Sequence, residues 1–202
     1  VVSVTKTVAD PVESAEVNDL GTLKVLETAR RSGVKRMVLA SSSAVYGSDP
    51  TLPKHEGLAT LPVSPYAASK LATEQYALAW QKSFGLRTLA FRFFNVYGPN
   101  EHHKGGMRSL VTKAYPTAAK GDPVTLFRSH HPDYPDGGQM RDFVYVEDAC
   151  AVNLWFLDNP GVSGIYNVGT GRSQSFNDVA NAVVAWHGKG KLRYIPFPDH
   201  LK

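Results

Sequence analysis

The chain has very little cysteine, no long apolar run and no block of one charge. Its 202 residues include a single cysteine, Cys150, which excludes an internal disulfide framework and fits a reducing compartment. No apolar stretch approaches the length of a membrane-spanning helix, and the N-terminus lacks the basic and apolar segments of a secretory signal. The 22 basic and 18 acidic residues are interspersed, without the basic block of a nucleic-acid-binding arm. We therefore expect a cytoplasmic globular protein with no membrane or nucleic-acid partner.

Helix-like and strand-like segments alternate along the chain. Apolar residues recur at helical spacing from Pro11 to Ser32, and a second helix is predicted from Ser64 to Phe84, with Ser64 and Pro65 as its cap and first turn. A short apolar, β-branched run from Val34 to Ala40 predicts the first strand. The other predicted strands are 86–91, 124–127, 143–146 and 165–168, and the other helices are 147–157 and 175–186. This alternation predicts an α/β fold of βαβ units on a largely parallel sheet.

One group of polar residues has the spacing of an acid–base site. Tyr66 and Lys70 are four residues apart on a predicted helix, so they share a face and the Lys70 ammonium can favour the Tyr66 phenolate. Ser42 follows the first predicted strand, at the carboxyl edge where α/β sheets bind ligands, and could hydrogen-bond the same substrate oxygen. Such a group can move a proton while a hydride leaves carbon. For the pair alone, a surface tyrosine beside a solvated lysine is the alternative interpretation.

Several longer motifs occur in an order that resembles the extended short-chain dehydrogenase/reductases, specifically the nucleotide-sugar epimerases and dehydratases. The similar segments are Leu39–Gly47, Ser64–Lys70, Phe91–Pro99, Arg141–Asp148 and Tyr166–Gly171. The resemblance covers nearly the whole chain and rests on the ordered set, because each motif alone is short. It implies an enzyme that uses NADP or NAD as cofactor and acts on a nucleotide sugar, and we expect a homo-oligomer.

The resemblance implies roles for residues on the cofactor side of such a site. Ser42 and Tyr66 would hold the reacting sugar oxygen, and Lys70 would bind the nicotinamide ribose and tune Tyr66. Asn18 resembles a cofactor-side asparagine of the family. A solvent-facing asparagine in the middle of a helix is the alternative for Asn18.

On the substrate side, the resemblance implies that Asn95 contacts the sugar nucleotide and that Arg141 pairs with its diphosphate. Two parallel charge-assisted hydrogen bonds from a guanidinium suit that second role. An Arg141–Asp142 surface pair is the alternative.

The glycine-rich loop by which the family binds its cofactor does not occur in the sequence, and Gly169 and Gly171 follow the wrong strand to replace it. Val1 to Val4 resemble the end of a strand, which suggests that preceding chain is missing. We therefore expect a Rossmann-like doubly wound parallel sheet that lacks its N-terminal glycine-rich unit. Residues 1–95 would be the remaining part of the dinucleotide-binding domain. Residues 96–202 would mainly form a smaller substrate-binding lobe, with a strand near 164–168 returning to the sheet.

From Arg92 onward the chain is similar to the ADP-L-glycero-D-manno-heptose 6-epimerases. The stretch Asn95–Met107 implies that the second acid/base lysine of those enzymes is Lys104, with His103 lining the sugar site. Two groups suit this chemistry, because the hydride returns to the opposite face of the carbonyl and one acid/base can serve each orientation: Tyr66 and Lys104. A solvated loop lysine is the alternative for Lys104.

The first half of the chain looks more like UDP-hexose or UDP-N-acetylhexosamine 4-epimerases. The segments that carry this likeness are Asp49–Lys54 and Ser64–Tyr76. A 4-epimerase rotates its keto sugar and uses one tyrosine for both half-reactions, so Lys104 would be dispensable. A 4-epimerase and a mosaic sequence are therefore alternatives.

Two further interpretations concern other classes of site. The adjacent pairs His102-His103 and His130-His131 do not predict a metal site, because neighbouring side chains diverge and neither pair has partners at metal-ligand spacing. A non-catalytic fragment that binds a sugar nucleotide or a partner chain is the alternative to an enzyme, and binding of NADP(H) would discriminate between them.

Overall fold

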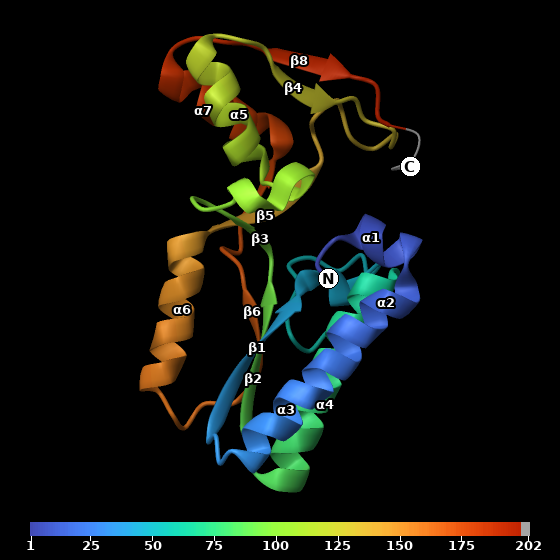
Figure 1. Cartoon of the computed structure of the whole chain (residues 1–202). Helices are drawn as coiled ribbons and strands as arrows, with labels where there is room; N and C mark the ends of the chain where they lie inside the picture. The colour runs from blue at the N-terminus through green and yellow to red at the C-terminus, as the bar shows by residue number, and fades with distance from the viewer. Residues whose placement is uncertain (199–202) are drawn as a thin grey trace. The chain divides into compact units, whose positions relative to one another are not determined.

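The computed structural model describes residues 1–198 and contains two compact units (Figure 1). The first unit consists of Val1–Phe94 and Cys150–Val168, and the second of Asn95–Ala149 and the residues from Gly169 on. The chain therefore leaves the first unit after residue 94 and returns to it for residues 150–168. Within the described part of the chain, no helix combines the length and the apolar character that crossing a bilayer requires.

The N-terminal residues form helices. Helix α1 spans Val4–Ala9 and is capped by Ser3, whose Oγ accepts a hydrogen bond from the Lys6 amide at 3.2 Å. The prediction that Val1 to Val4 end a strand is wrong, because this serine cap starts a helix at Val4. The next helical segments are α2 (Pro11–Ala15), the π-helical turn η1 (Glu16–Leu20) and α3 (Gly21–Arg31). The predicted long helix is thus present, with one π turn near its centre.

Parallel strands form the centre of the first unit. They are β1 (Arg36–Ser42), β2 (Arg87–Phe93) and β6 (Gly164–Val168), in the order β1-β2-β6. Helix α4 (Pro65–Phe84) packs on β1 and β2, and Figure 1 shows it on the side of the sheet opposite α6 (Val146–Asp158). Parallel strands with helices on both faces confirm the predicted α/β fold.

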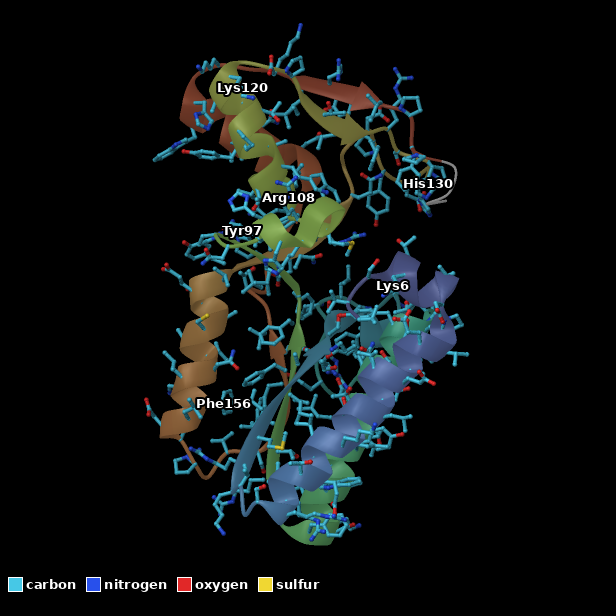
Figure 2. The ribbon with its side chains drawn as sticks, viewed as in Figure 1. Lys6, Tyr97, Arg108, Lys120, His130 and Phe156 are labelled. Carbon is cyan, nitrogen blue, oxygen red and sulfur yellow. The ribbon has the colours of Figure 1, made fainter. Side chains whose placement is uncertain are left out.

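The two faces of this sheet have separate apolar packing. On the side of α3 and α4, the buried residues are Leu26, Leu39, Ala77 and Leu86. On the other side, the Phe156 ring centroid of α6 lies 4.9 Å from that of Phe91 and 5.2 Å from that of Tyr166. Figure 2 shows Phe156 pointing from α6 toward the sheet. Strands β2 and β6 are thereby packed against α6, whereas Val38 and Ala40 of β1 remain exposed.

Strand β1 extends two residues further than the sequence predicts. Ser41 and Ser42 belong to the strand instead of following it, because the Ser41 side chain is buried and donates a hydrogen bond to Glu74 Oε1 at 2.5 Å. The short 3-10 helix η2 (Ser43–Tyr46) comes next. Ser42 consequently lies at the carboxyl end of β1.

The second unit contains short strands and two helices. Strand β3 (Asn95–Tyr97) pairs in parallel with β5 (Met140–Tyr145), β7 (Ser173–Ser175) pairs antiparallel to β5, and β4 (Val124–Phe127) pairs in parallel with β8 (Leu192–Ile195). The helical segments are η3 (His102–Met107), α5 (Leu110–Lys120) and α7 (Phe176–His187). Helices α5 and α7 pack against each other and against β4, around the buried residues Ala114, Ala118, Val124, Leu126, Ala180 and Val183.

Candidate active site

The start of helix α4 positions Tyr66. Ser64 Oγ accepts a hydrogen bond from the Ala67 amide at 3.1 Å, and Pro65 occupies the first helical position, where its missing N–H costs nothing. Tyr66 follows in the first turn and is half-buried. The helix continues for 20 residues and ends at Gly85 in the left-handed conformation. The tyrosine therefore stands on a rigid element with a defined start.

Lys70 lies one turn further along α4 and connects the helix to the sheet. Its Nζ donates a hydrogen bond to the Ala40 carbonyl of β1 at 2.9 Å and lies 5.9 Å from the centroid of the Tyr66 ring. Burial lowers the pKa of the Lys70 ammonium below its ordinary value. The lysine and the tyrosine thus lie together, as their spacing predicts.

Ser42 lies two residues after the carbonyl that binds Lys70. Its side chain is half-buried and its Oγ accepts a hydrogen bond from the Ala44 amide at 3.2 Å, which caps η2. The hydroxyl remains free to donate a hydrogen bond to a ligand, because this contact uses only the oxygen as acceptor. The Ser42 hydroxyl thus lies on the same strand as the Ala40 carbonyl to which Lys70 donates.

Asn18 belongs to η1 and contacts helix α4, which carries Tyr66 and Lys70. Its Nδ2 donates hydrogen bonds to Ser69 Oγ of α4 at 3.0 Å and to the Val1 carbonyl at 2.9 Å. The interpretation of Asn18 as solvent-facing is therefore wrong, because the side chain is half-buried and bonded to α4. Asn18, Lys70 and Thr73 line a cavity of about 390 Å³ beside β1.

This cavity provides a test of whether the residues fit a nicotinamide cofactor. An amide, a threonine hydroxyl and an ammonium of lowered pKa, from Asn18, Thr73 and Lys70, are suitable hydrogen-bonding groups for the nicotinamide ribose. Residues 1–198 contain no glycine-rich turn between a strand and a helix to hold a diphosphate. The residues fit the nicotinamide side of such a cofactor.

A buried polar network lies behind this site and was not predicted from the sequence. Glu74 of α4 is fully buried and accepts hydrogen bonds from Arg92 Nε and Nη2 of β2, both at 2.8 Å. Arg92 Nη1 also donates to the Tyr46 hydroxyl at 2.9 Å, and this hydroxyl donates to Asn167 Oδ1 at 2.7 Å. Burial alone would lower the pKa of Arg92, but its hydrogen bonds to Glu74 and Tyr46 raise it. The spacing from Lys70 to Glu74 is the one sequence signal, since it puts both on one helix face.

In the second unit, Asn95 and Arg141 lie on the paired strands β3 and β5. Asn95 Nδ2 donates a hydrogen bond to the Asp142 carbonyl at 3.1 Å across the β3–β5 pair. The predicted alternative of an Arg141–Asp142 surface pair is wrong, because the Asp142 carboxylate accepts hydrogen bonds from Thr170 and Gly171. The exposed guanidinium of Arg141 donates to the Met140 carbonyl and lies 5.9 Å from the Phe176 ring centroid.

Lys104 and His103 both lie on η3 and are both exposed. Lys104 Nζ donates a hydrogen bond to Glu101 Oε1 at 3.1 Å, so the lysine is paired rather than merely solvated. Glu101 is buried, and no local pattern of residues indicates this burial. Within residues 1–198, no three His, Cys, Asp or Glu side chains form a group that could hold a metal ion.

The fold defines a class: a Rossmann-like α/β protein, in which the Tyr66–Lys70 pair of α4 contacts the parallel strand β1 through the Ala40 carbonyl. The model of the "NAD dependent epimerase/dehydratase family" matches residues 1–169, and the chain belongs to this family. The family predicted from the motifs is therefore confirmed.

The chain is also similar to named proteins and to solved structures of nucleotide-sugar epimerases. The chain is 46% identical over 168 residues to the ADP-L-glycero-D-manno-heptose-6-epimerase of Alkalilimnicola ehrlichii. The matched region covers 82% of this chain and 51% of that protein. The UDP-glucose 4-epimerase of Thermus thermophilus in complex with NAD is 39% identical with a TM-score of 0.83, covering 98% of the chain and 62% of the other. The heptose epimerase of Helicobacter pylori is 32% identical with a TM-score of 0.77, covering 89% and 54%. The chain spans about half the length of the curated relatives it matches.

Proposed function

We propose that this chain is part of a nucleotide-sugar epimerase of the ADP-L-glycero-D-manno-heptose 6-epimerase type. The observation that carries the proposal is the pairing of Tyr66 with Lys70, whose Nζ lies 5.9 Å from the tyrosine ring and is hydrogen-bonded to the end of β1. The identity of 44–46% to curated proteins named as heptose epimerases supports the substrate class.

The two units take different parts in the proposed reaction. The first unit would bind the nicotinamide side of NADP or NAD through Asn18, Tyr66 and Lys70. The second would hold the nucleotide sugar through Asn95 and Arg141, with His103 beside the sugar. The exposure of the Arg141 guanidinium supports this assignment, since an anionic diphosphate can reach it.

The chemistry follows from the groups on each unit. A bound nicotinamide dinucleotide supplies the acceptor and donor of a hydride. Ser42 donates a hydrogen bond to the reacting sugar oxygen, and Tyr66 takes the proton from that oxygen as the carbon becomes a carbonyl. The neighbouring Lys70 ammonium stabilises the tyrosine in its phenolate form. Lys104 returns a proton to the oxygen when the carbonyl is reduced on its opposite face.

A UDP-hexose 4-epimerase is the second candidate. The likeness to the Thermus thermophilus enzyme over 98% of the chain favours it. In that reaction the keto sugar rotates and brings its oxygen back to Tyr66, so that Lys104 has no chemical role.

The test compares wild-type protein and Lys104→Ala on an ADP-heptose and a UDP-hexose, with NADP or NAD added. We expect Lys104→Ala to lower heptose epimerisation severely while a Tyr66-dependent half-reaction survives, seen as slow reduction of added cofactor. Lys120→Ala, an exposed lysine at the end of α5, is the matched control and should behave as wild type. Full heptose epimerisation by Lys104→Ala would refute the two-residue mechanism, and binding without turnover in every protein would favour the non-catalytic fragment.

A further inference from the structure

The buried carboxylate of Glu101 accepts hydrogen bonds from Lys104, Ser109 and Thr112. Glu101 precedes η3 and is only 5% exposed. Its Oε2 accepts from Thr112 Oγ1 and from Ser109 Oγ, both at 2.6 Å, and from the Ser109 amide at 3.2 Å. Its Oε1 accepts from Lys104 Nζ at 3.1 Å. One oxygen is thus fixed to the start of α5, and the other is turned to the lysine.

This ion pair has one buried end and one accessible end. The Glu101 side chain is 6% exposed and the Lys104 side chain is 41% exposed. Burial alone would raise the pKa of Glu101, but hydrogen bonds from Ser109, Thr112 and Lys104 lower it to about 2. The carboxylate is therefore charged at any pH at which the protein would work, and it holds an ammonium that a ligand can still reach.

Two other cationic side chains near η3 donate hydrogen bonds to backbone carbonyls. Arg108 Nε, on a residue labelled in Figure 2, donates to the Gly105 carbonyl at 2.9 Å, and Lys113 Nζ of α5 donates to the Gly106 carbonyl at 2.6 Å. His102 and His103 are exposed on the same turn. In the described part of the chain, Lys104 is the cation that forms an ion pair with Glu101.

We propose that Glu101 is a positioning residue for Lys104: its buried carboxylate, anchored by Ser109 and Thr112, holds the ammonium where it can act as an acid on a bound sugar. The inference rests on the proposed function, in which Lys104 is the second acid/base. A lysine on a short turn has several rotatable bonds, and a fixed counter-charge 3.1 Å from its Nζ restricts them.

The first experiment does not depend on catalysis. The rate at which a small amine-acylating reagent modifies Lys104 is measured by mass spectrometry, relative to Lys120 in the same sample. Glu101→Gln removes the charge while keeping an acceptor for α5, so Lys104 should react about three- to tenfold faster, which corresponds to a weak to moderate ion pair. An unchanged ratio would overturn the proposal whatever the protein catalyses.

Thr112→Val provides the second variant, because it removes one donor to Oε2 and leaves the charge facing Lys104. It should lower stability while changing the labelling ratio less than twofold. Were Glu101→Gln to fail to fold, Thr112→Val together with Ser109→Ala would still loosen the anchor, and the labelling of Lys104 should then rise. No rise in a folded double variant would contradict the anchoring role.

The second experiment is a double-mutant cycle on heptose epimerisation. Glu101→Gln should lower kcat about ten- to a hundredfold with little change in KM, and it should spare the Tyr66-dependent half-reaction as Lys104→Ala does. In the Glu101→Gln, Lys104→Ala double variant the losses should not multiply, since both remove one function. Multiplying losses would show a separate structural effect and overturn the proposal. If Lys104→Ala is itself fully active, the proposed function fails while the labelling result still stands.

Discussion

The two units each contain a buried glutamate paired with a cation, but the cations differ in exposure. In the first unit, Glu74 and Arg92 have side chains 0% and 5% exposed, and both belong to long elements, α4 and β2. In the second unit, Glu101 is as well buried, but its partner Lys104 is 41% exposed on a short turn. A pair buried at both ends fixes structure, whereas a pair buried at one end presents a charge to whatever binds.

The two candidate acid/base residues, Tyr66 and Lys104, also differ in the structural elements that hold them. Tyr66 is held by a capped 20-residue helix that packs on two strands. The side chain of Lys104 is held on a short turn by its hydrogen bond to the Glu101 carboxylate. A substitution in the first unit should therefore act through packing and chemistry together, and one in the second unit through a single contact.

The largest effect should come from Tyr66→Phe, which removes the hydroxyl and little surface. We expect epimerisation to fall by about 10²–10⁴-fold, the usual contribution of a general acid–base group. Binding of the nucleotide sugar should be nearly unchanged, since the substitution deletes one hydroxyl and leaves the proposed contacts of Asn95, His103 and Arg141 in place. Turnover and ligand titration on the same preparation test this, and an unchanged turnover number would end the assignment of Tyr66.

The next largest effect should be the loss of stability in Glu74→Ala. Removing the carboxylate leaves the guanidinium of Arg92 buried without its charge partner, which costs about 3–5 kcal/mol of unfolding free energy. Chemical denaturation measures it. Glu27→Gln is the control, because Glu27 pairs with Arg30 and Arg31 at the surface and should change the midpoint far less. Equal midpoints for the two variants would mean that the Glu74–Arg92 pair has no special structural role.

The sequence predicted correctly those helices and strands whose start and end are indicated by residues adjacent to them in the chain. The Ser64-Pro65 cap and Gly85 bound α4 almost to the residue, and β4 occurs at the predicted 124–127. Strands β3 and β7 have three residues each and exist by pairing with β5, so no local pattern announces them. Helix α5 contains Pro116, which ordinarily ends a helix, and packing against α7 outweighs that signal.

The same distinction applies to the candidate site. The four-residue spacing of Tyr66 and Lys70 is visible in the sequence because it depends only on helix geometry. The burial of Glu74 and Glu101 is not visible, since it depends on β2 in one case and on α5 in the other. Nothing in the sequence around Glu101 distinguishes it from the surface residue Glu27.

A smaller effect should appear as acid dependence of stability in the second unit. The folded-state pKa of Glu101 is about 2, below the ordinary 4.5, so its stabilising contribution is complete above about pH 4.5. It should be lost as the pH falls from there toward 2. Unfolding by urea at pH 7 and pH 3 should therefore show a stability loss on the order of 1–3 kcal/mol larger in wild type than in Glu101→Gln. Other carboxylates titrate in both proteins and cancel, so identical losses would contradict the low pKa of Glu101.

The smallest effect compares two serine caps, one on each unit. Ser64 Oγ accepts one hydrogen bond, from the Ala67 amide at the start of α4, and Ser64→Ala should cost about 1 kcal/mol. Ser109 Oγ caps α5 by accepting from the Thr112 amide at 3.3 Å, and it also donates to the Glu101 carboxylate at 2.6 Å. Ser109→Ala should therefore cost about 1–2 kcal/mol more than Ser64→Ala, because a hydrogen bond to a charged group is lost as well as a cap. The excess should shrink when both are compared in a Glu101→Gln background, where the acceptor of the Ser109 hydroxyl is neutral. An undiminished excess there would mean that the Ser109 hydroxyl stabilises α5 alone, and that the carboxylate is anchored by Thr112.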